Sequence, residues 1–104
     1  MNTHESKLYW AIQKRRDPKL IAATLRLKQI GARLDLELGM TEQALMDHAI
    51  RDASEALCIL PQKLNPESMQ HVDVMSAVIT AFFEDLLDSD PRVDRSKSHS
   101  SYGQ

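Results

Sequence analysis

The sequence contains few of the residues that crosslink a chain or cradle a nucleotide. Among its 104 residues are one cysteine, three glycines, one tryptophan, two tyrosines and two phenylalanines. Without a second cysteine, Cys58 cannot form an internal disulfide, which fits a reducing compartment, and we expect a cytoplasmic protein. With so few glycines, the chain has neither a glycine-rich phosphate loop nor a dinucleotide-binding fingerprint. The aromatic content predicts a core built largely from aliphatic side chains and methionine.

Long hydrophobic runs are also missing. No apolar stretch approaches the roughly 20 residues that cross a bilayer, and residues 1–16 are too polar and charged for a secretory signal. The hydrophobic fraction of 42% and the charged fraction of 27% are typical of a soluble globular protein. A chain of 104 residues suffices for one domain with a modest core. We therefore expect a single domain without membrane association.

Charge is unevenly distributed along the chain. Residues 1–34 contain eight basic and two acidic residues, whereas residues 35–90 contain two basic and twelve acidic residues. The last fourteen residues are again slightly basic, so that the net charge is only −2. The two halves could neutralise each other in the fold, which is the commoner arrangement, or form separate faces for partners of opposite charge.

Hydrophobic periodicity predicts an all-α protein: a compact bundle of three to four helices with a flexible C-terminal tail. Residues 1–88 form the expected single domain, and the Ser- and Asp-rich residues 89–104 form the expected tail, because they bury too little apolar surface to offset the entropy of ordering. The expected helices span about 4–16, 18–38, 42–60 and 66–87.

Capping residues mark the expected helix ends. Asn2 and Thr41 are suitable N-caps, and the pairs Asp17-Pro18 and Asn65-Pro66 each combine an N-cap with a proline at the first helical position. Gly39 is the expected stop of the second helix. Gly31 lies within that helix, where we interpret it as a point of close helix packing. Cys58 is expected at a buried helix end, as an inert thiol.

Residues for catalysis or metal binding do not form a convincing set. Glu67 and His71 have an i, i+4 spacing that could bring both to one ion, but the same spacing is commoner in a surface hydrogen bond. No Ser–His–Asp grouping can be found, so we expect no catalytic residues, no metal and no cofactor. The acidic residues at the end of the fourth helix, Glu84, Asp85 and Asp88, are unfavourable at a helix C-terminus and could contact a basic partner.

A nucleic-acid-binding regulator is the alternative hypothesis, based on the basic N-terminal half. Lys19, Arg26 and Arg33 recur every seven residues along one helix edge, a spacing that could follow phosphates. The candidate anion or nucleic-acid contacts are Lys14, Arg15, Arg16, Lys19, Arg26 and Arg33.

A short stretch of the chain also resembles a DNA-binding family. Gly39-Met40-Thr41, Leu45-Met46 and Ala49-Ile50-Arg51 resemble the second-helix region of ribbon-helix-helix repressors, and the resemblance implies DNA binding. It covers about thirteen residues, and no strand of alternating polar residues precedes the first helix as in that family. In a helix-turn-helix arrangement around Gly39, the reading helix would be acidic and phosphate would repel it.

A protein partner accounts for more of the sequence. The fourth helix is apolar over more than one face, and five methionines favour adaptable contacts. The adjacent aromatic residues of the first helix cannot easily both be buried. The candidate interface residues are Tyr9, Trp10, Met75, Ile79, Phe82, Phe83 and Leu86. We therefore expect a small non-catalytic interaction module, dimeric or bound to another protein, with a regulatory, chaperone-like or inhibitory role; a small helical enzyme is the third hypothesis.

Overall fold

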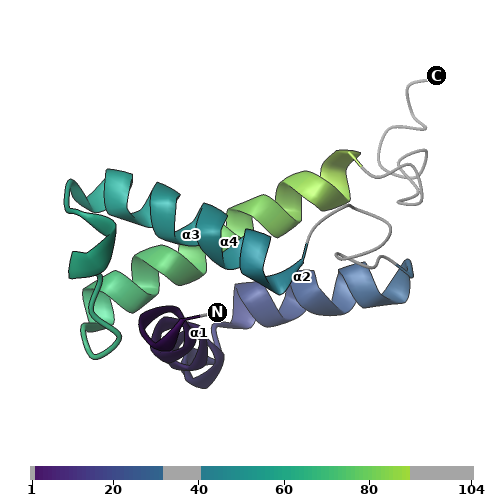
Figure 1. The fold of residues 1–104 in the computed structure, drawn as a ribbon. Helices are drawn as coiled ribbons and strands as arrows, with labels where there is room; N and C mark the ends of the chain where they lie inside the picture. Colours follow the sequence, from purple (N-terminus) through teal and green to yellow (C-terminus); the bar gives the residue numbers. More distant parts are fainter. Residues whose placement is uncertain (1, 32–40, 90–104) are drawn as a thin grey trace.

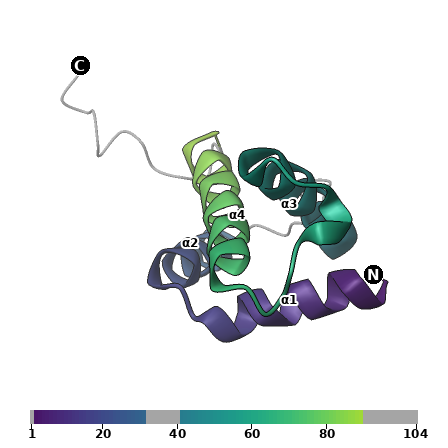
Figure 2. The same ribbon diagram turned by 90° about the vertical axis from the view of Figure 1, so that its left-hand side faces the viewer.

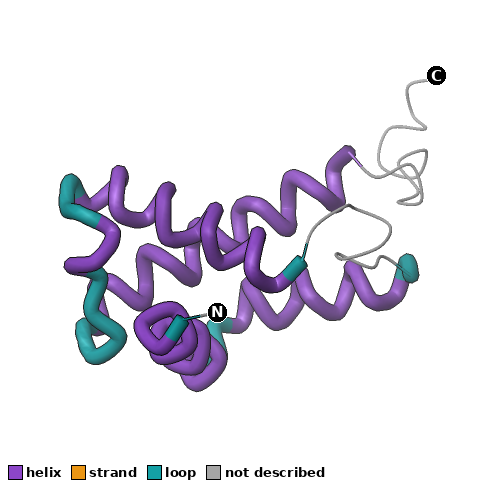
Figure 3. Tube along the Cα trace, in the orientation of Figure 1, coloured by secondary structure: helices purple, strands orange, loops and turns teal. Residues whose placement is uncertain are grey.

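The part of the chain that the structure describes forms four α-helices, and the periodicity predicts three to four. The computed structural model describes residues 2–31 and 41–89, and these ranges contain helices and connecting turns but no strand. The elements are α1 (Thr3–Arg15), α2 (Pro18–Gln29), α3 (Glu42–Leu57), the short 3-10 helix η1 (Pro61–Lys63) and α4 (Met69–Ser89) (Figure 1). The all-α class and the bundle architecture are thereby confirmed (Figure 3). No helix in the described ranges has both the length and the apolar character that a membrane span requires.

Three of the four expected N-caps are confirmed. The side-chain oxygen of Asn2 accepts a hydrogen bond from the Glu5 N–H at 2.8 Å, and that of Asp17 accepts one from the Lys19 N–H at 2.9 Å. Thr41 caps α3 in the same way, through the Ala44 N–H at 3.1 Å. Each cap satisfies a backbone donor that has no partner within its helix, which contributes about 1 kcal/mol.

Helix α2 ends earlier than expected, and Gly31 is the reason. The helix ends at Gln29, and Gly31 follows with a φ of +78°. Glycine adopts this left-handed conformation without steric cost and so ends the helix. A Cβ at Gly31 would have no neighbour within 4 Å, so the interpretation of Gly31 as a close packing point is wrong. The expected continuation to residue 38 and the stop at Gly39 lie outside the described residues.

Two other helix ends differ from the expectation. Helix α3 ends at Leu57, because Cys58 adopts a left-handed conformation with a φ of 58°. Cys58 is exposed there and not buried as expected. The Asn65 side chain caps a turn, accepting from the Glu67 N–H at 2.9 Å, so α4 begins only at Met69. The expected tail beyond Ser89 lies outside the described residues.

Helix α4 occupies the centre of the bundle. It packs against α2, α3 and α1, whereas α2 and α3 hardly touch each other. Figure 2 shows α4 between α2 and α3, with α1 crossing below them. The core therefore collects apolar side chains from every helix around α4: Leu8, Ile12, Ala23, Leu27, Leu45, Met46, Ala49, Ile50, Ala53, Leu64, Val72, Met75, Ile79 and Phe83.

The central position of α4 gives a different explanation for its wide apolar face, which the sequence alone indicates to be an interface with a partner. Three of its expected interface residues, Met75, Ile79 and Phe83, are 0%, 5% and 5% exposed within one chain. They are core residues within one chain, so α4 does not present a freely exposed apolar face, although Ile79 and Phe83 still reach the lining of a groove between α2 and α3. Because α4 has neighbours on three sides, an unusually wide apolar face is what a single chain needs at this position.

Candidate functional site

An apolar groove lies between α2 and α3, with α4 forming its floor. Its volume is about 610 Å³. Ile79 and Phe83 of α4 lie at the bottom, and Leu45 and Met46 of α3 form part of one wall. Tyr9, Ile12 and Gln13 of α1 also line it. The groove exists because α2 and α3 both pack on α4 and hardly on each other.

Helix α2 forms the other wall with side chains that the core does not use. Ile21 and Leu25 line the groove and are 44% and 52% exposed. They are four residues apart and therefore share one strip of the helix. Ala23 and Leu27, also four apart, point into the core and are 5% and 4% exposed. At about 100° per residue the two strips lie on different sides of α2, so this helix has one apolar strip for the core and a second for the groove.

Charged side chains surround the groove. Arg16 and Lys28 stand near the two ends of α2, and Glu42 begins α3 on the opposite side. Burial, and secondarily the negative charge of Glu42, raises the pKa of the Tyr9 phenol. Tyr9 is therefore neutral at physiological pH and can donate or accept a hydrogen bond in the lining of the groove.

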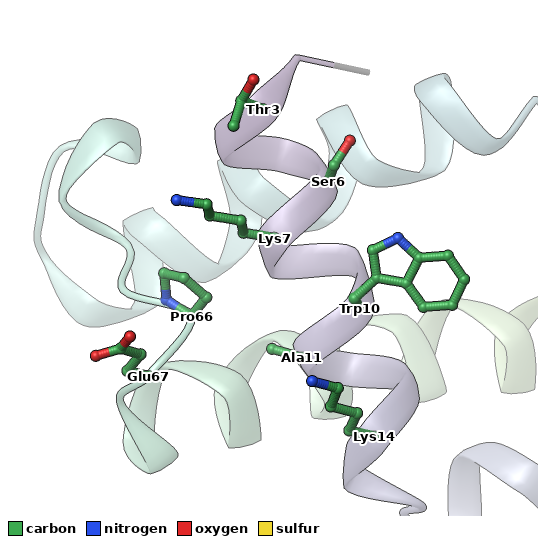
Figure 4. A pocket seen from close by; sticks show the side chains of 8 residues that line it. All are labelled: Thr3, Ser6, Lys7, Trp10, Ala11, Lys14, Pro66 and Glu67. Carbon is green, nitrogen blue, oxygen red and sulfur yellow. The ribbon is translucent and has the colours of Figure 1, made fainter.

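A second hollow lies on the outer side of α1, about 460 Å³ in volume. Lys7, Trp10 and Lys14 line it from α1, and Pro66 and Glu67 line it from the loop before α4. Figure 4 shows the indole of Trp10 projecting to one side of α1 and the loop with Pro66 and Glu67 on the other. Trp10 is 60% exposed, and its ring packs edge-to-face against Tyr9 at a centroid distance of 5.3 Å.

The seven candidate interface residues do not form one surface. Tyr9 lines the groove, and Trp10 lies at the outer hollow. Phe82 and Leu86 are partly buried, and the Phe82 ring packs against the His48 ring at 4.9 Å. The groove residues Ile21 and Leu25 were not among the candidates. The signal for them was present, since α2 carries more apolar residues than one core-facing stripe accounts for.

The basic candidates are also dispersed. Arg15 forms an ion pair with Asp73 of α4, Arg16 lines the groove and Lys14 lines the outer hollow. Lys19 and Arg26 are exposed on α2, while Arg33 lies outside the described residues.

The uneven charge of the sequence persists at the molecular surface. Residues 2–31 contain seven basic and two acidic residues, and residues 41–89 contain two basic and nine acidic residues. Within these ranges, Arg15–Asp73 is the ion pair that joins the two parts. The helices α1 and α2 thus present a basic surface, and α3 and α4 an acidic one that includes the exposed residues Glu84, Asp85 and Asp88.

Two histidines of the described ranges have local hydrogen-bonding partners. His71 accepts a hydrogen bond through Nδ1 from the Asn65 N–H at 3.0 Å, and His48 Nε2 lies 3.1 Å from the Asp52 carboxylate. Across residues 2–31 and 41–89, no three histidine, cysteine or acidic side chains are grouped as a metal site requires.

The part of the chain that resembled a ribbon-helix-helix repressor forms the first half of α3. Leu45, Met46, Ala49 and Ile50 are core residues there, and Gly39 and Met40 lie outside the described residues. Comparison with protein-family models, with curated proteins and with solved structures finds no match to this chain.

Proposed function

We propose that the protein is a non-catalytic interaction module that binds an apolar helix of a protein partner in the groove between α2 and α3. The observation that carries the proposal is the exposure of Ile21 and Leu25, 44% and 52%, beside a floor made of core residues. An exposed apolar strip that continues into a groove is typical of a protein-binding surface.

The energetics favour such a contact. Complete burial of an isoleucine or leucine side chain contributes about 1.5–3 kcal/mol. Ile21 and Leu25 are already about half covered, so each would contribute about 1 kcal/mol more when a partner covers it. Contact with the apolar floor, made by Ile79 and Phe83, would add to this term.

The shape and charge of the groove indicate the kind of partner. A groove between two helices that lie over a third accepts another helix, with anchor side chains spaced i, i+3, i+4 and i+7. Lys28 of α2 and Arg16, just before it, line the groove together with the acidic N-cap Asp17, and α2 also exposes Lys19 and Arg26. An amphipathic helix with acidic residues beside its apolar stripe would complement this basic wall. By covering such a helix, the protein would regulate, protect or inhibit the partner.

A second copy of the chain is the other occupant that the groove could accept. The strip of Ile21 and Leu25 has the i, i+4 spacing of a helical anchor, so two copies could each place this strip in the groove of the other. The expected homodimer would then form through α2 and not through α4.

A pair of matched substitutions on α2 tests the proposal. Leu25→Asp places a charge in the groove, and Ala22→Asp places the same charge at an exposed position outside its lining. Both variants should keep the wild-type helical circular dichroism, because both sites are exposed. The same two positions should be replaced by a photo-crosslinking residue for experiments in the native cell.

We expect a specific protein crosslink from position 25 and none from position 22, and Leu25→Asp should abolish the complex that Ala22→Asp retains. The mass of the purified protein, measured by light scattering, then distinguishes a partner helix from a second copy of the chain. A dimer that Leu25→Asp converts to a monomer shows that the groove binds a second copy. A monomer at high concentration with no crosslink from position 25 would refute the proposal.

A further inference from the structure

We infer that the outer face of α1 holds a second binding site, for single-stranded nucleic acid, in which a base stacks on Trp10 and the neighbouring phosphates contact Lys7 and Lys14. The site shares no lining residue with the groove, so the inference does not depend on the proposed function.

The three side chains lie on one stretch of α1. Lys7, Trp10 and Lys14 follow each other at spacings of three and four residues, so their Cα atoms lie along one strip of the helix, from which Lys7 extends toward Pro66 and the Trp10 indole to the opposite side (Figure 4). At a rise of about 1.5 Å per residue, the two lysines are separated by about 10 Å along the helix axis, with Trp10 between them. Ala11 lines the hollow as well, and its small side chain lies on the side of α1 that faces Pro66 (Figure 4).

The indole is available for stacking. Trp10 is 60% exposed, an unusual exposure for the largest apolar side chain in the protein. The edge-to-face contact with Tyr9, at 5.3 Å and an interplanar angle of 81°, holds the ring in place without covering it. A pre-oriented exposed indole can stack on a nucleobase at little cost in conformational entropy.

The charges around the hollow favour a phosphate backbone. Neither Lys7 nor Lys14 forms an ion pair within the described ranges, so both ammonium groups are free to contact phosphates. Arg15, next to Lys14, is held instead by Asp73. Glu67 is the one acidic residue in the lining of the hollow, and it should weaken anion binding without preventing it.

A single strand fits this arrangement better than a duplex. Stacking on an aromatic side chain requires a base that is free of its own stack, and such bases are available in single strands. A duplex would offer its phosphates alone, and two lysines provide little affinity without the stacked base. The site would bind with little sequence preference, because every base has a face that can stack.

The fluorescence of Trp10 gives a direct test, because the chain contains no other tryptophan. The full-length protein should be titrated at low salt with a single-stranded octathymidylate, with the corresponding duplex, and with poly-glutamate. We expect quenching with the single strand and little with the other two probes. The logarithm of the affinity should fall with the logarithm of salt concentration with a slope of about −1.4, as for two phosphate contacts at about −0.7 each.

Variants then assign the contacts, with anisotropy of a labelled oligonucleotide as the readout. Trp10→Ala should weaken binding about tenfold or more, as expected for the loss of one stacked base. Lys7→Ala or Lys14→Ala should reduce the salt slope by about 0.7, and Glu67→Gln should strengthen binding. Lys19→Ala, on α2, is the matched control and should change neither quantity.

The opposite results overturn the inference. An absence of quenching at low salt would exclude a stacked base. Equal binding of the duplex would show general attraction to phosphate, and equal quenching by poly-glutamate would identify an acidic peptide as the ligand. A loss with Lys19→Ala as large as that with Lys14→Ala would place the contact on the basic surface in general and not at this hollow.

Discussion

The two apolar strips of α2 can be told apart by their contributions to stability. Leu25 and Leu27 are two residues apart on the same helix, but they are 52% and 4% exposed. Truncating each to alanine removes the same atoms from very different surroundings. The comparison therefore measures whether Leu25 is a free surface residue in solution, which the proposed groove requires.

The structure sets the size of the two effects. Leu27→Ala deletes a core side chain and leaves a cavity, so a loss of about 2–5 kcal/mol in the free energy of unfolding is expected. Leu25 is about half covered, so Leu25→Ala forfeits about 1 kcal/mol of burial at most. Part of that loss is recovered, because alanine has a higher helix propensity than leucine by a few tenths of a kcal/mol.

Urea denaturation followed by far-ultraviolet circular dichroism is the appropriate assay, with both variants and the wild type at one protein concentration. Leu27→Ala should lower the midpoint strongly, and Leu25→Ala only slightly, with unchanged m values. In thermal unfolding the difference corresponds to about 4–8 °C per kcal/mol for a domain of this size. If both variants lose the same stability at a concentration where light scattering gives a monomer, Leu25 is covered within one chain and the reasoning about the groove is wrong.

Two further predictions concern electrostatic contacts. Asp73→Asn should lower the free energy of unfolding by less than about 1 kcal/mol, and by less still at high salt, because Arg15 and Asp73 are both substantially exposed. Denaturation at two salt concentrations measures this loss, and a large loss that salt does not change would contradict the prediction. Glu42→Gln should lower the pKa of Tyr9 only in part, since burial is the larger cause of its elevation; phenolate absorbance in a Tyr102→Phe background reports it. Because the folded state raises this pKa, the contribution of Tyr9 to stability should be complete below the pKa of a free tyrosine and should decline as pH rises through the folded value. An unchanged Tyr9 pKa in Glu42→Gln would show that the charge of Glu42 does not act on Tyr9.

Much of the local structure could be predicted from the sequence. The caps at Asn2, Asp17 and Thr41 are correct, because a cap requires only a side-chain oxygen and a backbone N–H two or three residues away. At Gly31 a local property was also decisive, but the sequence prediction followed the apolar stripe, which continues beyond this residue and indicated a longer helix. The conformational freedom of glycine ended the helix there, although the hydrophobic pattern continued.

The candidate site could be predicted only in part. Tyr9 and Trp10 were identified as residues that cannot both be buried, and each lines a surface hollow. Ile79 and Phe83, two of the expected interface residues, are core residues that form the floor of the groove. The amount of apolar surface on α4 was evident from its sequence, but the number of helices that cover it was not.

The sequence by itself determined that the protein is helical, where most of its helices begin, and that its charge is divided between the two halves of the chain. These properties depend on hydrogen bonds within a few residues and on composition. Only the tertiary structure decided that α4 is central, that α2 and α3 stand apart, and that Ile21 and Leu25 remain exposed. Burial depends on which distant helices meet, and an apolar side chain has the same chemistry whether a neighbouring helix covers it or not.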